Sequence, residues 1–332
     1  MALIIEEPGL HSTVQDLGRP GFYNVGIPLG GAMDRMSHHI ANLLVGNDPA
    51  AATIECTYTG PSFVVTSPTV MSVAGATVDV KVNDETVPQW AAIELRDGDS
   101  VSCQFATAGS RFYLAFRGGI DVPEALGSRG TYTLGGIGGF KGRQLAGGDQ
   151  VEFNSGPILS TKRELPDRLR PRFSRSFNAR IVRGLYDHLL TADSRQMLTS
   201  TEWKLTPLAD RTGLRFNGTH PFEFNARKQP FGAGSDPSNI VDAGYAMGSI
   251  QIPGGGQPII LHRDAVSAGG YAMVGTVISA DMDGVSQLTP GGTCTFEAVS
   301  IEAALAARVE RNQLLASITE HLCDGDRSGR TA

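Results

Sequence analysis

The sequence is poor in charge, poor in cysteine and without a long apolar run, and each shortage excludes a class of protein. Charged residues make up 19% of the chain and its formal net charge is −6, so it lacks the basic excess of a nucleic-acid-binding protein. No apolar run approaches the roughly 20 residues that cross a membrane, and the first ten residues, MALIIEEPGL, lack the basic start of a secretory signal. We therefore expect a cytoplasmic protein that acts on small molecules or protein partners.

The cysteines are too few and too scattered for a disulfide framework or a metal site. The chain has four of them, Cys56, Cys103, Cys294 and Cys323, and no two have CxxC spacing. Two of them, Cys103 and Cys294, fall in alternating apolar and polar runs, where a small buried thiol is common. We predict reduced, structural cysteines and no bound metal.

The common sequence signatures of catalysis are also missing. There is no GxxxxGK[ST] loop to cradle a nucleotide phosphate, no GxSxG elbow, and no HExxH motif. The sequence therefore argues against a chain that binds ATP through a P-loop, against a classical serine hydrolase and against a zinc protease.

What the chain has in excess is glycine, placed between short β-type runs. It contains 41 glycines in 332 residues, a composition that favours tight turns over long helices. Period-two or short apolar runs recur at residues 62–66, 69–74, 78–82, 100–105 and 112–116. Strands at this spacing are typical of a barrel or sandwich, so we predict a mainly β fold.

Two segments have helical periodicity. Residues 35–45 carry an apolar stripe and follow Asp34, a predicted N-cap, and residues 302–322 form the longest helical pattern. His38 and His39 lie within the first of these without metal-type spacing, and we predict that they are surface or interface residues.

Composition also marks where the chain divides. Residues 157–180 combine three prolines, six arginines and one lysine with few apolar side chains, which is typical of an extended linker. We predict an N-terminal barrel half at 1–156, this linker, a C-terminal barrel half at 181–300 that includes a helix at 187–198, and a C-terminal helix and tail at 301–332.

Candidate site residues lie in glycine-rich loops between strands, where binding sites are commonly built. Residues 245–282 hold two apolar runs around HRDAVSAGGY, and one amide, Gln251, interrupts an apolar strand before PGGG. The candidates are Gln15, Asp16, Arg19, Arg211, Gln251, Asp264, Tyr271 and Asp281. The competing interpretation is that these residues only cap turns and satisfy loop amides.

Several long motifs resemble one family in their order along the chain. The strings TVQDLGRPG, GGAMDRMSHHIANLLVGN, GGIDVPEALGSRGTYTLGGIGGFKGRQLAGGD, DRTGLR and GSIQIPGGGQPIIL, followed by DAVSAGGYAMVGTVISAD, are similar to those of the biotin-dependent carboxyltransferase family. This family includes the C subunit of bacterial 5-oxoprolinase, allophanate hydrolase subunit 2-like proteins and part of the urea carboxylase carboxyltransferase domain. Where the family often reads DRQTTGGY, this chain reads DAVSAGGY, so its substrate can differ.

The resemblance implies two tandem cyclophilin-like β-barrels and an enzyme that works only in a complex. It implies a B-type partner subunit of related fold, an A-type subunit that supplies ATP-driven chemistry, and, where biotin is used, a separate carrier chain. The implied reaction is ATP-dependent opening or carboxylation of a small cyclic amide or urea-like compound, with 5-oxoproline as the leading substrate.

Within that reaction we assign roles to the candidate residues. Asp264 and Asp281 are the expected catalytic groups that orient substrate or accept a proton, and Gln251 and Arg211 are expected to bind substrate or carboxybiotin. The remaining candidates, Tyr271, Gln15, Asp16 and Arg19, are expected to contribute substrate contacts. One alternative is a non-catalytic regulatory subunit that binds a partner of related fold, and a cyclophilin-like prolyl isomerase is disfavoured because no peptide-groove signature is present.

Overall fold

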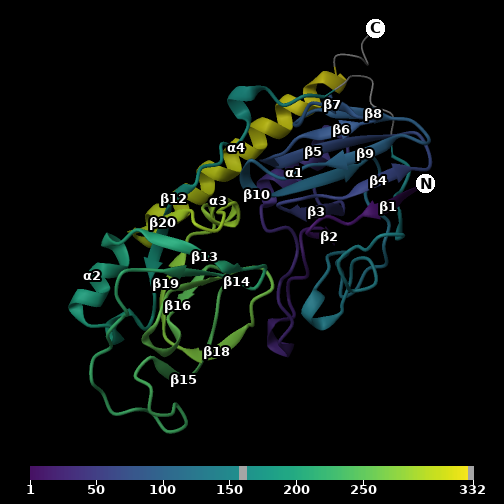
Figure 1. Ribbon diagram of the computed structural model, residues 1–332. Coiled ribbons are helices and arrows are strands. Elements are labelled where there is room, and N and C mark those ends of the chain that lie inside the picture. Colours follow the sequence, from purple (N-terminus) through teal and green to yellow (C-terminus); the bar gives the residue numbers. More distant parts are fainter. Residues whose placement is uncertain (157–162, 328–332) are drawn as a thin grey trace. The chain divides into compact units, whose positions relative to one another are not determined.

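Most of the predicted period-two runs are β-strands in the computed structural model, which describes residues 1–156 and 163–327. The chain divides into two units that are each discontinuous in sequence (Figure 1). Unit 1 comprises Met1–Arg19, Gly30–Phe173 and the chain from Asn312 onward, and unit 2 comprises Pro20–Leu29 and Ser174–Arg311. The mainly β class predicted from the sequence is confirmed.

Unit 1 contains two antiparallel sheets. The six-stranded sheet has the order β11-β1-β4-β9-β6-β7 and the five-stranded sheet has the order β2-β3-β10-β5-β8. The strands are β1 (Ala2–Glu7), β2 (His11–Gln15), β3 (Thr53–Thr57), β4 (Ser62–Val65), β5 (Thr69–Thr77), β6 (Val80–Val82), β7 (Glu85–Val87), β8 (Ala92–Leu95), β9 (Ser100–Cys103), β10 (Ala108–Phe116) and β11 (Gln150–Glu152).

The core of unit 1 is made by strand residues of both sheets. Alternation along the strands turns one set of side chains inward, and an aromatic group lies at the centre of the buried cluster. The ring of Phe116 meets Phe63 edge-on and Phe153 in a stacked arrangement, each with centroids 5.7 Å apart. Burial of this apolar surface, at about 25 cal/mol per Å², is the main force that holds the sheets together.

Helix α1 (Arg35–Leu44) packs against β5 and β10, and its N-cap is the predicted one. The carboxylate of Asp34 accepts hydrogen bonds from the Ser37 amide at 2.9 Å and from the Ser37 hydroxyl at 2.6 Å. Ile40 and Leu44 are fully buried in a second apolar cluster. The apolar face of α1 is therefore part of the unit 1 core and is not available as a contact surface for a partner subunit.

The prediction that His38 is a surface or interface residue is wrong. Its side chain is fully buried and its ring meets the edge of Tyr113 with centroids 5.7 Å apart. Tyr113 in turn donates a hydrogen bond to the buried Glu55 at 2.7 Å. Local sequence did not reveal this because α1 is covered by strands that are distant along the chain. His39 is half-buried and lies 3.2 Å from the hydroxyl of Thr319.

The burial of His38 predicts a stability that falls on acidification. Burial lowers the pKa of His38 to about 4, a larger effect than the opposing pull of Asp16 and Glu55. Between about pH 6.5 and pH 4, His38 is therefore protonated in the unfolded chain and neutral in the folded chain. The free energy of unfolding falls over this range by up to about 1.4 kcal/mol per pH unit. Urea unfolding at several pH values should show a shallower fall for His38→Leu. The exposed His220→Gln is the control, and an equal slope in His38→Leu and the unaltered chain would contradict the assignment.

Unit 2 is built around a closed seven-stranded barrel of order β12-β19-β16-β17-β14-β13-β20. A two-stranded ribbon, β15 with β18, accompanies it (Figure 1). The strands are β12 (Ser176–Arg183), β13 (Trp203–Ala209), β14 (Gly213–Asn217), β15 (Asn239–Gly244), β16 (Ser249–Gln251), β17 (Ile259–Leu261), β18 (Ala268–Tyr271), β19 (Met273–Val277) and β20 (Thr293–Ala298). The barrel expected in the second half is present, whereas the strands of unit 1 form two sheets.

Two predicted boundaries in unit 2 differ from the structure. The predicted helix at 187–198 is instead a short 3-10 turn, Asp187–Leu189, and a separate helix α2 (Ala192–Ser200), because the Thr191 hydroxyl caps a new helix by accepting from the Ser194 amide. The predicted linker ends early, since β12 begins at Ser176 and pairs in parallel with β20. Residues 157–162 of that linker lie outside the described residues.

The remaining helices are α3 (Met282–Ser286) and α4 (Ile301–Arg327), the second of which confirms the long helical pattern. Ile318 and Leu322 are buried in unit 1, whereas Ile301, Leu305 and Val309 are exposed at four-residue intervals. Across residues 1–156 and 163–327, every helix is too short or too polar to span a bilayer.

The cysteines in the β runs behave as predicted. Cys103 in β9 and Cys294 in β20 are free and buried, and burial raises the pKa of each thiol to about 12. A thiol held in this protonated form is a poor nucleophile, which agrees with a structural role.

Candidate functional site

Three predicted site residues of unit 1 meet at one loop. They belong to the TVQDLGRPG motif at the end of β2, and all three contact residues 128–131. The amide of Gln15 donates to the Thr131 carbonyl at 3.0 Å, and the guanidinium of Arg19 donates to the Gly130 carbonyl. The structure therefore brings Gln15, Asp16 and Arg19 together.

The carboxylate of Asp16 accepts three hydrogen bonds, two of them from residues 128 and 129. One carboxylate oxygen accepts from the Gly18 amide at 2.8 Å and from the Ser128 hydroxyl at 2.7 Å. The other accepts from the Arg129 amide at 2.6 Å. Because an ionised carboxylate accepts hydrogen bonds strongly, Asp16 fixes the course of the backbone through this loop.

Two glycines allow a second loop to pack closely on the first. Gly138 and Gly139 have φ values of +67° and +55°, in the left-handed region that favours glycine. A Cβ on Gly138 would lie 2.3 Å from the Gly130 carbonyl oxygen, and one on Gly139 would lie 1.8 Å from the Thr131 hydroxyl. The motif residues of β2 thus position the 138–142 loop through residues 128–131.

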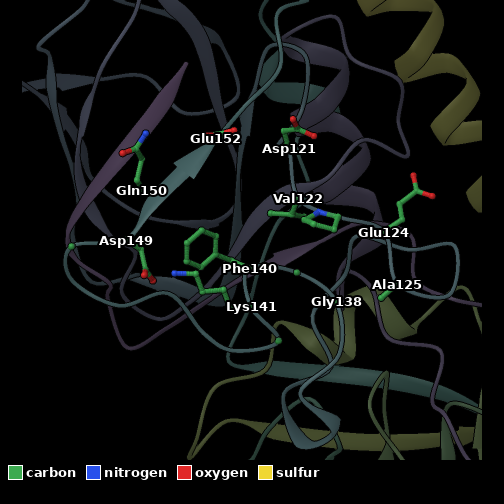
Figure 2. Close-up of a pocket in the computed structure, with 14 residues that line it drawn as sticks. Asp121, Val122, Glu124, Ala125, Gly138, Phe140, Lys141, Asp149, Gln150 and Glu152 are labelled. Atoms are coloured by element: carbon green, nitrogen blue, oxygen red, sulfur yellow. The ribbon is translucent and has the colours of Figure 1, made fainter.

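This second loop forms one wall of a cavity of about 670 Å³ in unit 1 (Figure 2). The volume suits a small molecule or the reactive end of a larger one. The lining residues are Asp121, Val122, Pro123, Glu124, Ala125, Gly138, Gly139, Phe140, Lys141, Gly142, Gly148, Asp149, Gln150 and Glu152. We refer to this space as the glycine-loop cavity.

The glycine-loop cavity combines an aromatic ring with charged groups. The ammonium of Lys141 lies 4.9 Å from the centre of the Phe140 ring. The guanidinium of Arg143 binds Asp149 through two contacts of 2.7 Å and holds the pKa of that carboxyl below its usual value. Arg129 also forms an ion pair, with Glu124 at 2.7 Å. A flat amide or ureido group could pack on the ring while these polar groups orient it.

One lining residue and one residue next to the lining have left-handed backbone. Lys141 has a φ of 57° and Leu126, which follows the lining residue Ala125, has a φ of 56°, values that residues other than glycine rarely adopt. Strained residues of this kind gather at functional sites. Sequence reasoning missed Phe140, Lys141 and Asp149, although GGFKGRQLAGGD was among the motifs that carried the family resemblance.

In unit 2, the predicted residues Arg211 and Asp264 form a buried ion pair. The guanidinium contacts the two carboxylate oxygens at 2.8 and 3.0 Å, and both side chains are at most 6% exposed. The backbones are also joined, since the Asp264 amide donates to the Arg211 carbonyl at 2.9 Å. The turn before β14 and the segment after β17 are thereby fastened together.

Asp281 belongs to a second ion pair. It accepts from the Arg180 backbone amide at 2.8 Å and from two nitrogens of the Arg180 guanidinium at 3.0 and 2.6 Å. These contacts join β12 to the start of α3.

The other two candidates of unit 2 are more accessible. Gln251 ends β16 and is half-buried, beside Ile259 and Met273 in the ladder. Tyr271 is 41% exposed, and its backbone amide and carbonyl both bond to the Tyr245 hydroxyl at 2.8 Å. Both side chains are placed where a ligand could reach them.

The contacts of Asp264 and Asp281 bear on the catalytic roles predicted for them. A general base needs a lone pair that faces its substrate, and the oxygens of Asp264 and Asp281 already accept from arginines. Their assignment as proton acceptors stays a prediction, and a positioning role agrees better with these contacts. Within residues 1–156 and 163–327, no group of three or more His, Cys, Asp or Glu side chains is arranged to hold a metal ion.

A family profile, individual sequences and solved structures all match this chain. A profile described as "Carboxyltransferase domain, subdomain A and B" matches residues 25–298. The chain is 32% identical to the C subunit of 5-oxoprolinase from Escherichia coli over 312 residues, a match that covers 94% of this chain and 96% of that relative.

Urea-degrading enzymes match over a smaller part of their length. The chain is 33% identical to the urea amidolyase of Saccharomyces cerevisiae over 326 residues, which cover 96% of this chain and 18% of that enzyme. The crystal structure of the K. lactis urea amidolyase superposes with a TM-score of 0.89 at 32% identity, covering 96% of this chain and 20% of that one. The chain thus spans about a fifth of the urea amidolyases that it matches.

Proposed function

The chain belongs to the family of carboxyltransferase domains built from subdomains A and B, and we propose that it is one subunit of an ATP-dependent complex acting on a small amide or urea-like compound. The finer proposal is a 5-oxoprolinase-type reaction, in which 5-oxoproline is opened to glutamate.

The observation that carries the proposal is how much of one relative the sequence alignment covers. Similarity to the C subunit of Escherichia coli 5-oxoprolinase covers 96% of that relative, whereas similarity to the urea amidolyase of Saccharomyces cerevisiae covers 18% of that enzyme. The relative that is matched over almost its whole length is a subunit of 5-oxoprolinase, which favours this reaction over a urea reaction. The sequence contains no Walker-type loop, so the proposal assigns the ATP chemistry to a partner.

The chemistry explains why a partner is needed. An amide or urea carbonyl is a poor electrophile, so a partner must first activate the substrate with ATP. In this proposal the present chain binds and orients the activated group, which can lower the barrier substantially by positioning alone. Phe140 would support the flat amide and Lys141 would meet a negatively charged oxygen, each from the wall of the glycine-loop cavity.

Biotin, where used, would arrive on a separate carrier and supply an activated carboxyl group. In this proposal its flat ureido ring would enter the glycine-loop cavity beside Phe140, where Lys141 and Asp149 supply polar groups. Gln251 and Tyr271 remain proposed ligand contacts of unit 2, whereas Arg211 is proposed to act indirectly, by holding Asp264 in place. The exposed stripe of Ile301, Leu305 and Val309 on α4 is the proposed surface for the B-type subunit.

The test compares the chain alone with the assembled complex. We expect no turnover of 5-oxoproline by the purified chain, and ATP hydrolysis coupled to 5-oxoproline loss once the A-type and B-type subunits are added. Urea, and small lactams other than 5-oxoproline, are assayed in the same way to establish the substrate class.

Turnover by the isolated chain would refute the need for partners. A complex that binds the chain tightly yet turns over none of these compounds would favour the alternative, a regulatory subunit.

A further inference from the structure

A second cavity of unit 1, of about 460 Å³, shares no lining residue with the glycine-loop cavity. It is lined by the start of β5, the end of β8, the residue after β10, and residues 154–156. Strands β5 and β8 are paired neighbours at one edge of the five-stranded sheet (Figure 1), so two hydrogen-bonded strands contribute to the cavity wall.

The cavity contains an arginine whose position is set by its surroundings. Arg117 directly follows β10, and its backbone amide donates to the Val70 carbonyl at 2.9 Å. The next amide, of Gly118, donates to the side chain of Asn47 at 2.7 Å. The stem of Arg117 passes Gly156 so closely that a Cβ there would lie 2.7 Å from the Arg117 Cγ. The scaffold therefore holds both the backbone and the stem of this side chain in place.

The guanidinium of Arg117 is incompletely satisfied. Its Nε is buried and has no hydrogen-bond acceptor among the described residues. Burial lowers the pKa of Arg117 below its usual value, and the carboxylate of Glu94 opposes this only in part. A buried guanidinium nitrogen without an acceptor is unfavourable, and a bound anion would satisfy the group.

A second arginine lines the same cavity. Arg96 is an exposed residue of the cavity wall, and its backbone amide donates to the Asp99 carboxylate at 2.7 Å. Two arginines thus share the cavity wall with one carboxylate, Glu94, in a protein whose net charge is −6. Thr69 and Ser155 also line the cavity, and both are neutral residues with a hydroxyl group.

We propose that this cavity is a binding site for a small oxyanion, a carboxylate or a phosphate, held by Arg117 with support from Arg96. The planar fork of a guanidinium matches two oxygens of either group. The site is separate from the glycine-loop cavity and does not depend on the proposed function.

The experiment measures anion binding by the full chain at low ionic strength. Thermal shift and calorimetry are run with inorganic phosphate, acetate and bicarbonate, against chloride at equal ionic strength. We expect at least one of the three to raise the melting temperature above the chloride value, and the anion that does so identifies phosphate or carboxylate as the ligand class.

Matched variants assign the effect to the cavity. Arg117→Gln should weaken binding by about tenfold or more because the charged fork is lost. Arg172→Gln, at an arginine that is 77% exposed and paired with Asp167, should bind like the unaltered chain. Without added anion, Arg117→Gln should melt no lower than the unaltered chain, since it removes a buried Nε–H group that has no acceptor among the described residues.

Arg117→Lys and Arg96→Gln provide further readouts if Arg117→Gln does not fold. The lysine keeps the charge without the fork, and each variant should weaken binding severalfold. An equal response in all variants, or no anion effect beyond chloride, would overturn the proposal.

Discussion

Replacing Asp264 by alanine is expected to lower the free energy of unfolding by about 3–5 kcal/mol, the usual result of removing one partner from a buried ion pair. Arg211 would keep its charge inside unit 2, with its side chain 6% exposed and without the two carboxylate contacts at 2.8 and 3.0 Å. Urea unfolding of the purified chain measures the loss.

Two control variants distinguish the cost of leaving Arg211 as an unpaired buried charge from the cost of removing a carboxylate side chain. The double variant Arg211→Met/Asp264→Leu should recover most of the stability, because it removes both charges and keeps apolar volume. Asp167→Ala breaks an ion pair whose side chains are 71–77% exposed and should change stability by less than about 1 kcal/mol. A loss for Asp264→Ala as small as that for Asp167→Ala would contradict the buried pair.

The same variants test the catalytic role predicted for Asp264. In the assembled complex, a double variant that regains stability and turnover would assign Asp264 to positioning the segment after β17. A double variant that regains stability and not turnover would support a direct role in the reaction. Gln251→Ala, at a half-buried strand end, should raise KM with little change in melting temperature.

Asp16→Ala is expected to reduce kcat/KM of the complex by about a hundredfold or more. The carboxylate holds Gly18, Ser128 and Arg129 through three hydrogen bonds of 2.6 to 2.8 Å. Without it, residues 128–131 lose their anchor, and the 138–142 loop that packs on them shifts the wall of the glycine-loop cavity. A displacement of about 1 Å in a positioning element is enough for a loss of this size.

Ser128→Ala is the matched control, because it leaves the Asp16 carboxylate in place with two of its three hydrogen bonds. It also removes the hydrogen bond that the Gly130 amide donates to the Ser128 hydroxyl at 2.9 Å. It should lose much less activity than Asp16→Ala, when both are compared at a temperature well below their melting points. Unchanged kinetics for Asp16→Ala in a folded complex would show that the glycine-loop cavity is not where the substrate is oriented.

The sequence determined those secondary-structure elements that depend only on residues close together along the chain. Alternation of side chains predicted β4 and β9 within one or two residues, because a strand with one buried face has a period of two. The predicted N-cap of α1 is also correct, since Asp34 and Ser37 lie within one turn and their hydrogen bond needs nothing else. The glycine-rich loops marked the general location of the candidate sites for the same reason, because glycine permits left-handed turns wherever it occurs.

Only the tertiary structure decided which distant residues meet. Nothing near Asp264 in sequence indicates that Arg211, 53 residues earlier, neutralises it, and nothing in α1 shows that β10 covers His38. The same holds for residues 20–29, which are early in the chain yet belong to unit 2. Burial, ion pairing and cavity walls depend on contacts between strands far apart along the chain, and a pattern of neighbouring residues does not encode them. The sequence therefore determined the family, the β class and the motifs. The fold decided that Asp16 supports a loop and that Asp264 is held in an ion pair. It also decided that Arg117 lines a cavity with an Nε that has no acceptor among the described residues.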